Sequence, residues 1–297
     1  MNYRKIGKSN LLVSEIGFGC MSLGEDNNEN IKLLREAENN GINYFDTADL
    51  YQKGQNEVIL GKAFRDIRKE VIIATKVGNK WRDDFSGWDW NPSKSYILQA
   101  VEQSLRRLHT DYIDLYQLHG GTIHDPIDDT ISAFETLKQQ GKILHYGISS
   151  IRPNVIREYV NRSEIISVMM QYSLLDRRPE ESCLKLLTNN NIGVLARGTL
   201  AKGLLIDKPA TDYLNYSTKE VEITANAVKS LSQNNRSVVN TAIGYVFKNS
   251  AICSSVVGIR TFEQLEVVLG YDSNPISENE YQLLEGSMVA NTYDQHR

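Results

Sequence analysis

The chain has 297 residues, of which 41% are apolar and 24% charged, a balance typical of a globular protein. Its length suits one large α/β barrel or two ordinary domains. The formal net charge of −4 argues against a nucleic-acid partner held by bulk electrostatics, so any bound anion needs a local cluster of basic residues.

Signals for a membrane, an export pathway or a structural metal are missing from the sequence. No apolar run reaches the roughly 18 residues of a membrane span, and the N-terminal residues lead into no apolar signal segment. The three cysteines, Cys20, Cys183 and Cys253, lie far apart and form no CxxC motif. We therefore expect a cytoplasmic protein with no metal site, no membrane partner and no nucleic-acid partner.

Eight short apolar runs predict strands. Most are rich in Val and Ile and continuously apolar, as expected for strands that are buried on both faces. The runs are 16–19, 42–46, 71–75, 113–118, 143–148, 166–171, 192–196 and 254–257.

Amphipathic segments between these runs predict helices. In 95–108 the apolar residues keep helical spacing, and 29–40 and 127–140 are each followed by a glycine where a C-terminal cap belongs. Strands that alternate with helices, without a linker, predict a single-domain (β/α)₈ TIM barrel over residues 1–297, with a C-terminal tail that is helical at 277–290. An open, doubly wound sheet is the main alternative.

Two long segments after predicted strands interrupt this alternation. The segment 78–92 contains all three tryptophans, Trp81, Trp88 and Trp90, and 200–217 follows the seventh run. Loops after the strands line the active face of such a barrel. The tryptophans could form the wall of a substrate cleft, or they could anchor their loop by packing.

Four reactive residue types stand where three consecutive runs end. Asp46 ends the second run and Tyr51 follows five residues later, Lys76 directly follows the third run, and His119 directly follows the fourth. If these strands are parallel and adjacent, the four side chains converge on one rim. Each alone has an ordinary structural explanation, such as a cap, a packing residue or a surface charge, so the prediction depends on their combination.

These four side chains suit proton transfer to an oxygen. A free phenol is a weak acid with a pKa of about 10, and a neighbouring ammonium favours its ionised form. Lys76 could act on Tyr51 in this way while Asp46 holds Lys76 charged, and His119 could donate a hydrogen bond to a carbonyl oxygen. The set has no activated nucleophile for acyl transfer, and a redox reaction would need an external electron source.

The segments 45–51, 74–76 and 114–119 resemble the signature segments of the aldo-keto reductase superfamily, and the similarity extends from 17–21 to 257–265. The chain resembles the bacterial branch that is similar to potassium-channel β-subunits and general stress oxidoreductases. The resemblance implies a barrel that reduces aldehydes and ketones to alcohols with NADPH. It also implies Tyr51 as the proton donor, Lys76 and Asp46 as its tuning partners, and His119 as the group that orients the carbonyl.

The phosphates of such a cofactor need a site other than the first glycine pair. Gly17 and Gly19 do not form a dinucleotide fingerprint, because Ser22 stands where the third glycine belongs. Barrels often bind phosphate with the loops after strands seven and eight and a helix N-terminus, here 197–203 and 258–261 before a helix at 262–269. Arg260 could hold a 2′-phosphate, which would favour NADP over NAD, or it could be a surface arginine.

The cofactor contacts that we expect combine this placement with the resemblance. They are Gly19, Cys20, Met21, Asp46, Ser149, Ser150, Gln171, Arg197, Gly198, Leu200, Gly203, Gly258, Arg260 and Gln264. The chain departs from the family pattern at four positions. Val268 and Ser150 replace usual asparagines, Arg197 replaces a tyrosine that stacks on the nicotinamide, and Met169 stands at a usual glutamine, with Gln171 two residues later on the same face.

Two functions of different class follow. The first is an NADPH-dependent carbonyl reductase that acts on a small-molecule substrate. The second is an NADPH-binding regulatory or redox-sensing subunit with weak catalysis, like the channel-subunit relatives. A metal-dependent barrel enzyme is not expected, because no second histidine stands at ligand spacing from His119. The sequence makes no prediction of the oligomeric state.

Overall fold

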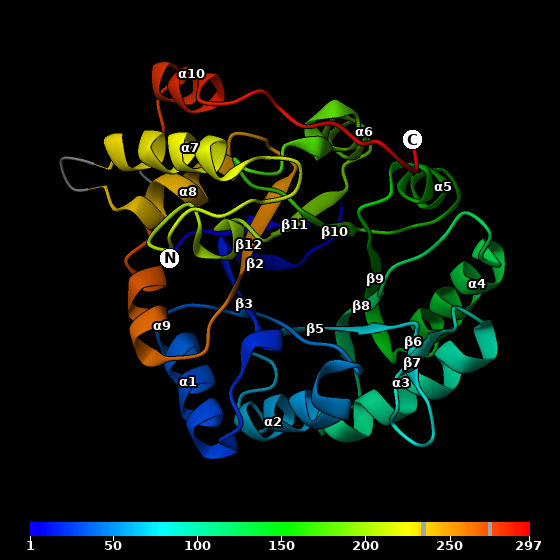
Figure 1. The fold of residues 1–297 in the computed structure, drawn as a ribbon. Helices are drawn as coiled ribbons and strands as arrows, with labels where there is room; N and C mark the ends of the chain where they lie inside the picture. The colour runs from blue at the N-terminus through cyan, green and yellow to red at the C-terminus, as the bar shows by residue number, and fades with distance from the viewer. Residues whose placement is uncertain (233–235, 273–274) are drawn as a thin grey trace.

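The computed structural model describes residues 1–232, 236–272 and 275–297, and its centre is a closed barrel of eight parallel strands (Figure 1). In barrel order the strands are β3 (Ile16–Gly19), β4 (Tyr44–Asp46), β5 (Ile72–Val77), β8 (Ile113–Leu118), β9 (Ile143–Ser149), β10 (Ser167–Gln171), β11 (Gly193–Arg197) and β12 (Ile252–Gly258). Each of the eight predicted runs overlaps one of them. The predicted TIM barrel is confirmed and the open sheet is excluded, because β12 pairs with β3.

Helices surround the barrel (Figure 1). Their bounds are α1 (Asn27–Asn39), α2 (Gln55–Ala63), α3 (Lys94–Leu108), α4 (Ile127–Gln139), α5 (Pro153–Arg162), α6 (Cys183–Asn189), α7 (Thr218–Ser230), α8 (Val238–Val246), α9 (Phe262–Leu269) and α10 (Glu278–Gly286). Local capping interactions determine where several of these helices begin or end. Ser93 caps α3 by accepting from the backbone N–H of Tyr96, and Gly41 takes a φ of +90° after α1.

The barrel is filled by side chains and has no open bore. An apolar cluster on the inward faces of the strands includes Tyr44, Leu115 and Met169, and a larger cluster lies between strands and helices. The hairpin of β1 (Tyr3–Lys5) and β2 (Leu12–Ser14) was not predicted. Residues Ile6, Leu11 and Val13, within and beside this hairpin, complete the inner cluster at the N-terminal end of the barrel. The reactive groups are therefore expected at the opposite, C-terminal end of the barrel.

The predicted tryptophan loop contains a second short hairpin, β6 (Asn79–Trp81) with β7 (Trp88–Trp90). The rings of Trp81 and Trp88 meet edge-on with centroids 5.4 Å apart. Trp90 packs against Gly78 so closely that a Cβ there would lie 2.6 Å from the indole. Trp90 therefore anchors its loop by packing, whereas 52% of the surface of Trp88 stays exposed.

The C-terminal helix is shorter than predicted. A capping box of Ser277 and Glu280 starts α10, but the helix ends at Gly286 and does not continue to residue 290. Glycine is a poor helix former, and Val289, which would prolong the helix, is 87% exposed. The tail then runs past α6 to α5 (Figure 1), where the Asn154 N–H donates to the His296 carbonyl over 2.9 Å. Residues 273–274, which precede α10 in the predicted tail, lie outside the described residues.

Candidate active site

The four predicted reactive residues lie together at the C-terminal end of the barrel. Asp46 ends β4, Lys76 lies on β5, His119 directly follows β8, and Tyr51 opens the 3₁₀ turn η2 (Tyr51–Gly54). Because β4, β5 and β8 are neighbours in the barrel, their carboxyl ends share one rim. The fold therefore brings these four side chains to one rim, as predicted.

Lys76 joins the carboxylate to the phenol. Its Nζ forms an ion pair with Oδ1 of Asp46, and both side chains are almost fully buried, with 1% and 5% of their surfaces exposed. The same Nζ donates to the Thr47 carbonyl over 2.7 Å and to Oη of Tyr51 over 3.4 Å. One buried ammonium thus contacts an acid, a backbone dipole and a phenol.

Burial and pairing act in opposite directions on these charges. Burial, the largest single effect, lowers the pKa of Lys76, but the charges of Asp46 and Tyr51 and the hydrogen bonds to them together outweigh it, so the pKa of Lys76 is raised. Burial raises the pKa of the Asp46 carboxyl, against the charge of Lys76 and hydrogen bonds from Lys76 and Gln117. The ammonium is therefore held in its charged form beside Tyr51.

His119 faces Tyr51 edge-on, with ring centroids 5.7 Å apart and an angle of 83° between the planes. Its backbone N–H donates to the Val77 carbonyl over 2.7 Å, which extends the pairing of β5 with β8. Burial, followed by the charges of Lys76 and Arg197, lowers the pKa of His119 to about 3. The imidazole is therefore neutral near pH 7 and carries one N–H that it can donate.

Gln117 also belongs to this cluster and was missed by the sequence reasoning. Its Nε2 donates to the second carboxylate oxygen of Asp46, Oδ2, over 3.2 Å, and the side chain is fully buried. The available signal was an amide within an otherwise apolar run, two residues before His119 and therefore on the same strand face.

On the opposite side of the rim, Gln171 ends β10 and Arg197 ends β11. Oε1 of Gln171 accepts from Arg197 Nη1 over 3.3 Å, and its Nε2 donates to Oη of Tyr213 over 3.1 Å. Met169 belongs to the apolar cluster inside the barrel. Strand alternation puts Gln171 on the same face, as predicted. Tyr213 was not predicted, because nothing in 200–217 distinguishes it from the other loop residues.

The loop after β11 turns back on itself through left-handed backbone. Gly198 has a φ of +69°, and the turn η4 (Ala201–Gly203) has positive φ at all three residues. Leu200 lies between these two points. The N–H groups of Ala201 and Gly203 donate to the carbonyls of Gly198 and Leu200, each over 2.8 Å, and so close the turn.

The loop after β12 carries the predicted arginine. Gly258 pairs with Gly19, and Gly19 pairs with Asp46, so these backbones are contiguous on the rim. Arg260 is exposed, its Nε donates to the Ser22 carbonyl over 3.0 Å, and its N–H donates to Gln264 Oε1 over 2.9 Å. The helix α9 starts immediately afterward, as predicted.

The other predicted contacts also follow barrel strands. Cys20 is buried and Met21 is 68% exposed in the turn η1 (Cys20–Ser22), which follows β3. Ser149 ends β9. Ser150 comes next, and its hydroxyl accepts from the Arg152 N–H over 3.2 Å in a local turn. The structure thus brings all of the predicted positions to one end of the barrel.

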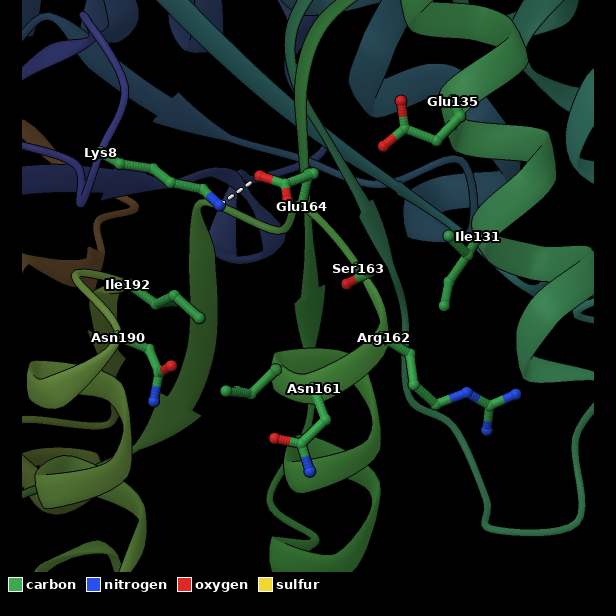
Figure 2. Close-up of a pocket in the computed structure, with 10 residues that line it drawn as sticks. Lys8, Ile131, Glu135, Asn161, Arg162, Ser163, Glu164, Asn190 and Ile192 are labelled. Carbon is green, nitrogen blue, oxygen red and sulfur yellow. Dashed lines mark hydrogen bonds and ion pairs between the residues drawn. The ribbon is translucent and has the colours of Figure 1, made fainter.

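A separate depression of about 470 Å³ lies elsewhere on the molecule (Figure 2). Figure 2 shows the ion pair of Lys8 and Glu164 across it, and Glu164 and Ile192 precede β10 and β11. It therefore lies at the N-terminal end of those strands, away from the reactive groups. Within residues 1–232, 236–272 and 275–297, no group of three or more His, Cys, Asp or Glu side chains could hold a metal ion. None of the described helices is long and apolar enough to cross a membrane.

A family model for the Aldo/keto reductase family matches residues 15–288. The chain belongs to this family. Aldo/keto reductases are oxidoreductases that reduce carbonyl groups with nicotinamide cofactors, and the reactive rim agrees with such chemistry. The predicted family resemblance is therefore confirmed.

Two relatives of this aldo/keto reductase cover its whole length, and a third covers part of it. It is 48% identical over 307 residues to an uncharacterized oxidoreductase, YqkF, of Bacillus subtilis (strain 168), with 100% of both chains covered. The holo form of aldo-keto reductase AKR11C1 from Bacillus halodurans matches with a TM-score of 0.95 and 46% identity, over 100% of this chain and 99% of that one. A protein named NADH-specific methylglyoxal reductase from Escherichia coli (strain K12) is 34% identical over 70% of each chain.

Proposed function

We propose that this aldo/keto reductase reduces aldehydes or ketones to alcohols with NADPH, and that Tyr51 delivers the proton. The observation that carries the proposal is the buried ammonium of Lys76, in contact with both Asp46 and Oη of Tyr51. An ammonium at this place stabilises the phenolate that remains after proton transfer.

Each residue of the cluster then has one task. Tyr51 gives its hydroxyl proton to the carbonyl oxygen as negative charge develops there. Lys76 stabilises the phenolate, and Asp46 holds Lys76 in place. His119, neutral because its pKa is about 3, donates an N–H to the same oxygen and orients the carbonyl. The reduced nicotinamide, when bound, supplies the hydride.

The residues on the opposite side of the rim fit a dinucleotide phosphate. The helix α9 begins beside Arg260, and the N-terminus of a helix suits an anion. Arg260 forms no ion pair with any carboxylate that the structure describes, so its guanidinium is available to an anion. We assign the 2′-phosphate to Arg260, the nicotinamide side to Ser149, Ser150, Gln171 and Arg197, and the rest of the cofactor to the other predicted contacts.

The test of the proton donor is Tyr51→Phe. This variant keeps the ring and its contact with His119 but removes the acid, so kcat should fall by roughly 10²–10⁴-fold. Binding of NADPH, followed by the fluorescence of the three tryptophans, should stay near the wild-type value. Turnover close to wild type in Tyr51→Phe would overturn the proposed role. Multiple turnovers of a simple aldehyde by the wild type would also argue against a purely regulatory subunit.

The test of the cofactor is a direct comparison of NADPH with NADH, since one relative is named as NADH-specific. Tighter binding of NADPH is expected, because only its 2′-phosphate can pair with Arg260. Equal or tighter binding of NADH would refute the assignment of Arg260 and leave the proton donor unaffected.

A further inference from the structure

The carboxylate of Asp46 is held by both of its oxygens. Oδ1 pairs with Lys76, and Oδ2 accepts from Nε2 of Gln117 over 3.2 Å. Gln117 and Lys76 are direct neighbours in the pairing of β5 with β8, so Gln117 reaches Asp46 across the strand that carries Lys76. The three side chains therefore form one buried chain of hydrogen bonds that ends at Oη of Tyr51.

Burial of Gln117 at this position lowers the stability of the folded protein. Its side chain is fully buried, and its Oε1 accepts no hydrogen bond from any residue that the structure describes. A buried acceptor without a partner lowers stability. An apolar side chain of similar size would avoid that loss, and Leu115 and Leu118 on the same strand are apolar. Residues that break local packing rules in this way are expected at functional sites.

We propose that Gln117 is a positioning residue for the proton donor. A carboxylate bound through one oxygen can rotate about its Cβ–Cγ bond, whereas a second hydrogen bond fixes that rotation. By holding Oδ2, Gln117 keeps Oδ1 directed at Lys76 and so keeps Nζ of Lys76 beside Tyr51. This inference rests on the proposed role of Tyr51 as the acid.

Other titratable groups also face this cluster. The thiol of Cys20, the hydroxyl of Tyr44 and the guanidinium of Arg197 lie near Asp46, and His119 packs against Tyr51. Cys20, Arg197 and His119 do not hydrogen-bond to the Asp46 side chain among the described contacts, whereas the Tyr44 hydroxyl lies close enough that burial and then the Asp46 carboxylate raise its pKa. They are the same in wild type and in Gln117 variants, so a difference between the two reports on Gln117.

The experiment measures kcat for aldehyde reduction against pH, at saturating NADPH, in Gln117→Leu and Gln117→Glu. Leu removes the donor at similar volume, and Glu keeps the shape but places an acceptor against Asp46. In Gln117→Leu we expect kcat to fall about ten- to a hundredfold, because Lys76 is no longer aligned with the phenol. The alkaline limb of the profile should move to higher pH, since a misplaced ammonium favours the phenolate less. In Gln117→Glu, kcat should fall by at least the same factor.

Ser167→Ala is the matched control. Ser167 is also fully buried in a barrel strand with an Oγ that lacks a described partner, but it does not contact Asp46. Its kcat and its pH profile should match the wild type. Binding of NADPH by all three variants, followed by tryptophan fluorescence, should also match the wild type.

The outcomes separate this inference from the proposed function. An alkaline limb at the wild-type pH in Gln117→Leu and Gln117→Glu would overturn the positioning role, even if the variants melt at a lower temperature. Should Gln117→Leu fail to fold, Gln117→Met, which also lacks the donor and adds no charge, takes its place. Turnover retained in Tyr51→Phe would overturn the proton donor itself. If Tyr51→Phe is inactive but the alkaline limb of the pH profile stays at the wild-type pH in the Gln117 variants, only the role of Gln117 is overturned.

Discussion

The two sides of the barrel rim are built differently. On the reactive side, Lys76 and Asp46 are nearly inaccessible, and their polar atoms bind one another and Gln117. On the side of β12, Arg260 and Gln264 are exposed and held mainly by backbone contacts. The reactive side is thus organised before any ligand arrives, whereas the other side presents free donors. Changes on the first should alter turnover and stability, and changes on the second should alter cofactor affinity.

The largest effect is expected from Lys76→Met. This change leaves the Asp46 carboxylate buried without its counter-ion, so the free energy of unfolding should fall by about 3–5 kcal/mol. The rate constant kcat should fall about as far as in Tyr51→Phe. Urea denaturation and steady-state kinetics measure the two quantities. Adding Asp46→Asn should restore part of the stability and none of the turnover, and a single variant as stable as wild type would contradict the buried ion pair.

On the opposite side, Arg260→Gln should weaken NADPH binding by about 1.5–3 kcal/mol, the usual contribution of hydrogen bonds to a charged group. Affinity for NADH, and kcat at saturating NADPH, should stay unchanged. Fluorescence titrations with both cofactors measure this. Arg65→Gln, at an exposed arginine after α2, is the control and should bind both cofactors like wild type. If Arg260→Gln weakened both cofactors equally, Arg260 would not read the 2′-phosphate.

His119, on the reactive side, should make the free energy of unfolding depend on pH under acidic conditions. Its pKa is about 3 in the folded protein and about 6.5 when exposed, so in this window the unfolded chain binds a proton that the folded one does not. Stability therefore falls as pH falls from about 6.5 toward 3, by up to about 1.4 kcal/mol per pH unit from this residue. His119→Gln should lack this contribution. Urea midpoints at pH 7, 6 and 5 would show it, and parallel curves for both proteins would disprove it.

The smallest effect is expected at Asp49, a buried carboxyl two residues before Tyr51 whose Oδ1 lacks a partner among the described residues. Burial, followed by the charge of Glu57, raises its pKa well above the usual value. A raised pKa penalises the folded state as pH rises above the unfolded value. Asp49→Asn should therefore stabilise the protein by about 1 kcal/mol at pH 8, and by less at pH 5.

Thermal melts at both pH values measure the Asp49 effect. Glu57→Gln is the contrast, because Glu57 is paired with Arg107 and Thr75 and should lose stability instead. Equal changes in the two variants would show that the unpartnered oxygen of Asp49 does not matter.

Much of the fold could be predicted because its signals are local. Continuous apolar runs mark strands buried on both faces, and Gly41 and Ser93 mark helix ends whatever surrounds them. The hairpins β1–β2 and β6–β7 could not be predicted, because strands of three residues are too short to show an alternating pattern. The end of α10 was misplaced because an amphipathic pattern continues past the glycine that stops the helix.

The sequence by itself determined which reactive groups stand at strand ends. Asp46, Lys76 and His119 each follow an apolar run, and that information is local. Only the tertiary structure decided which oxygen of Asp46 meets which partner. Gln117 and Asp46 are 71 positions apart in the chain, and their contact depends on the closure and register of the barrel. Burial, also a property of the whole fold, then determines the charge of these groups, because desolvation acts on every ionised side chain that the barrel encloses.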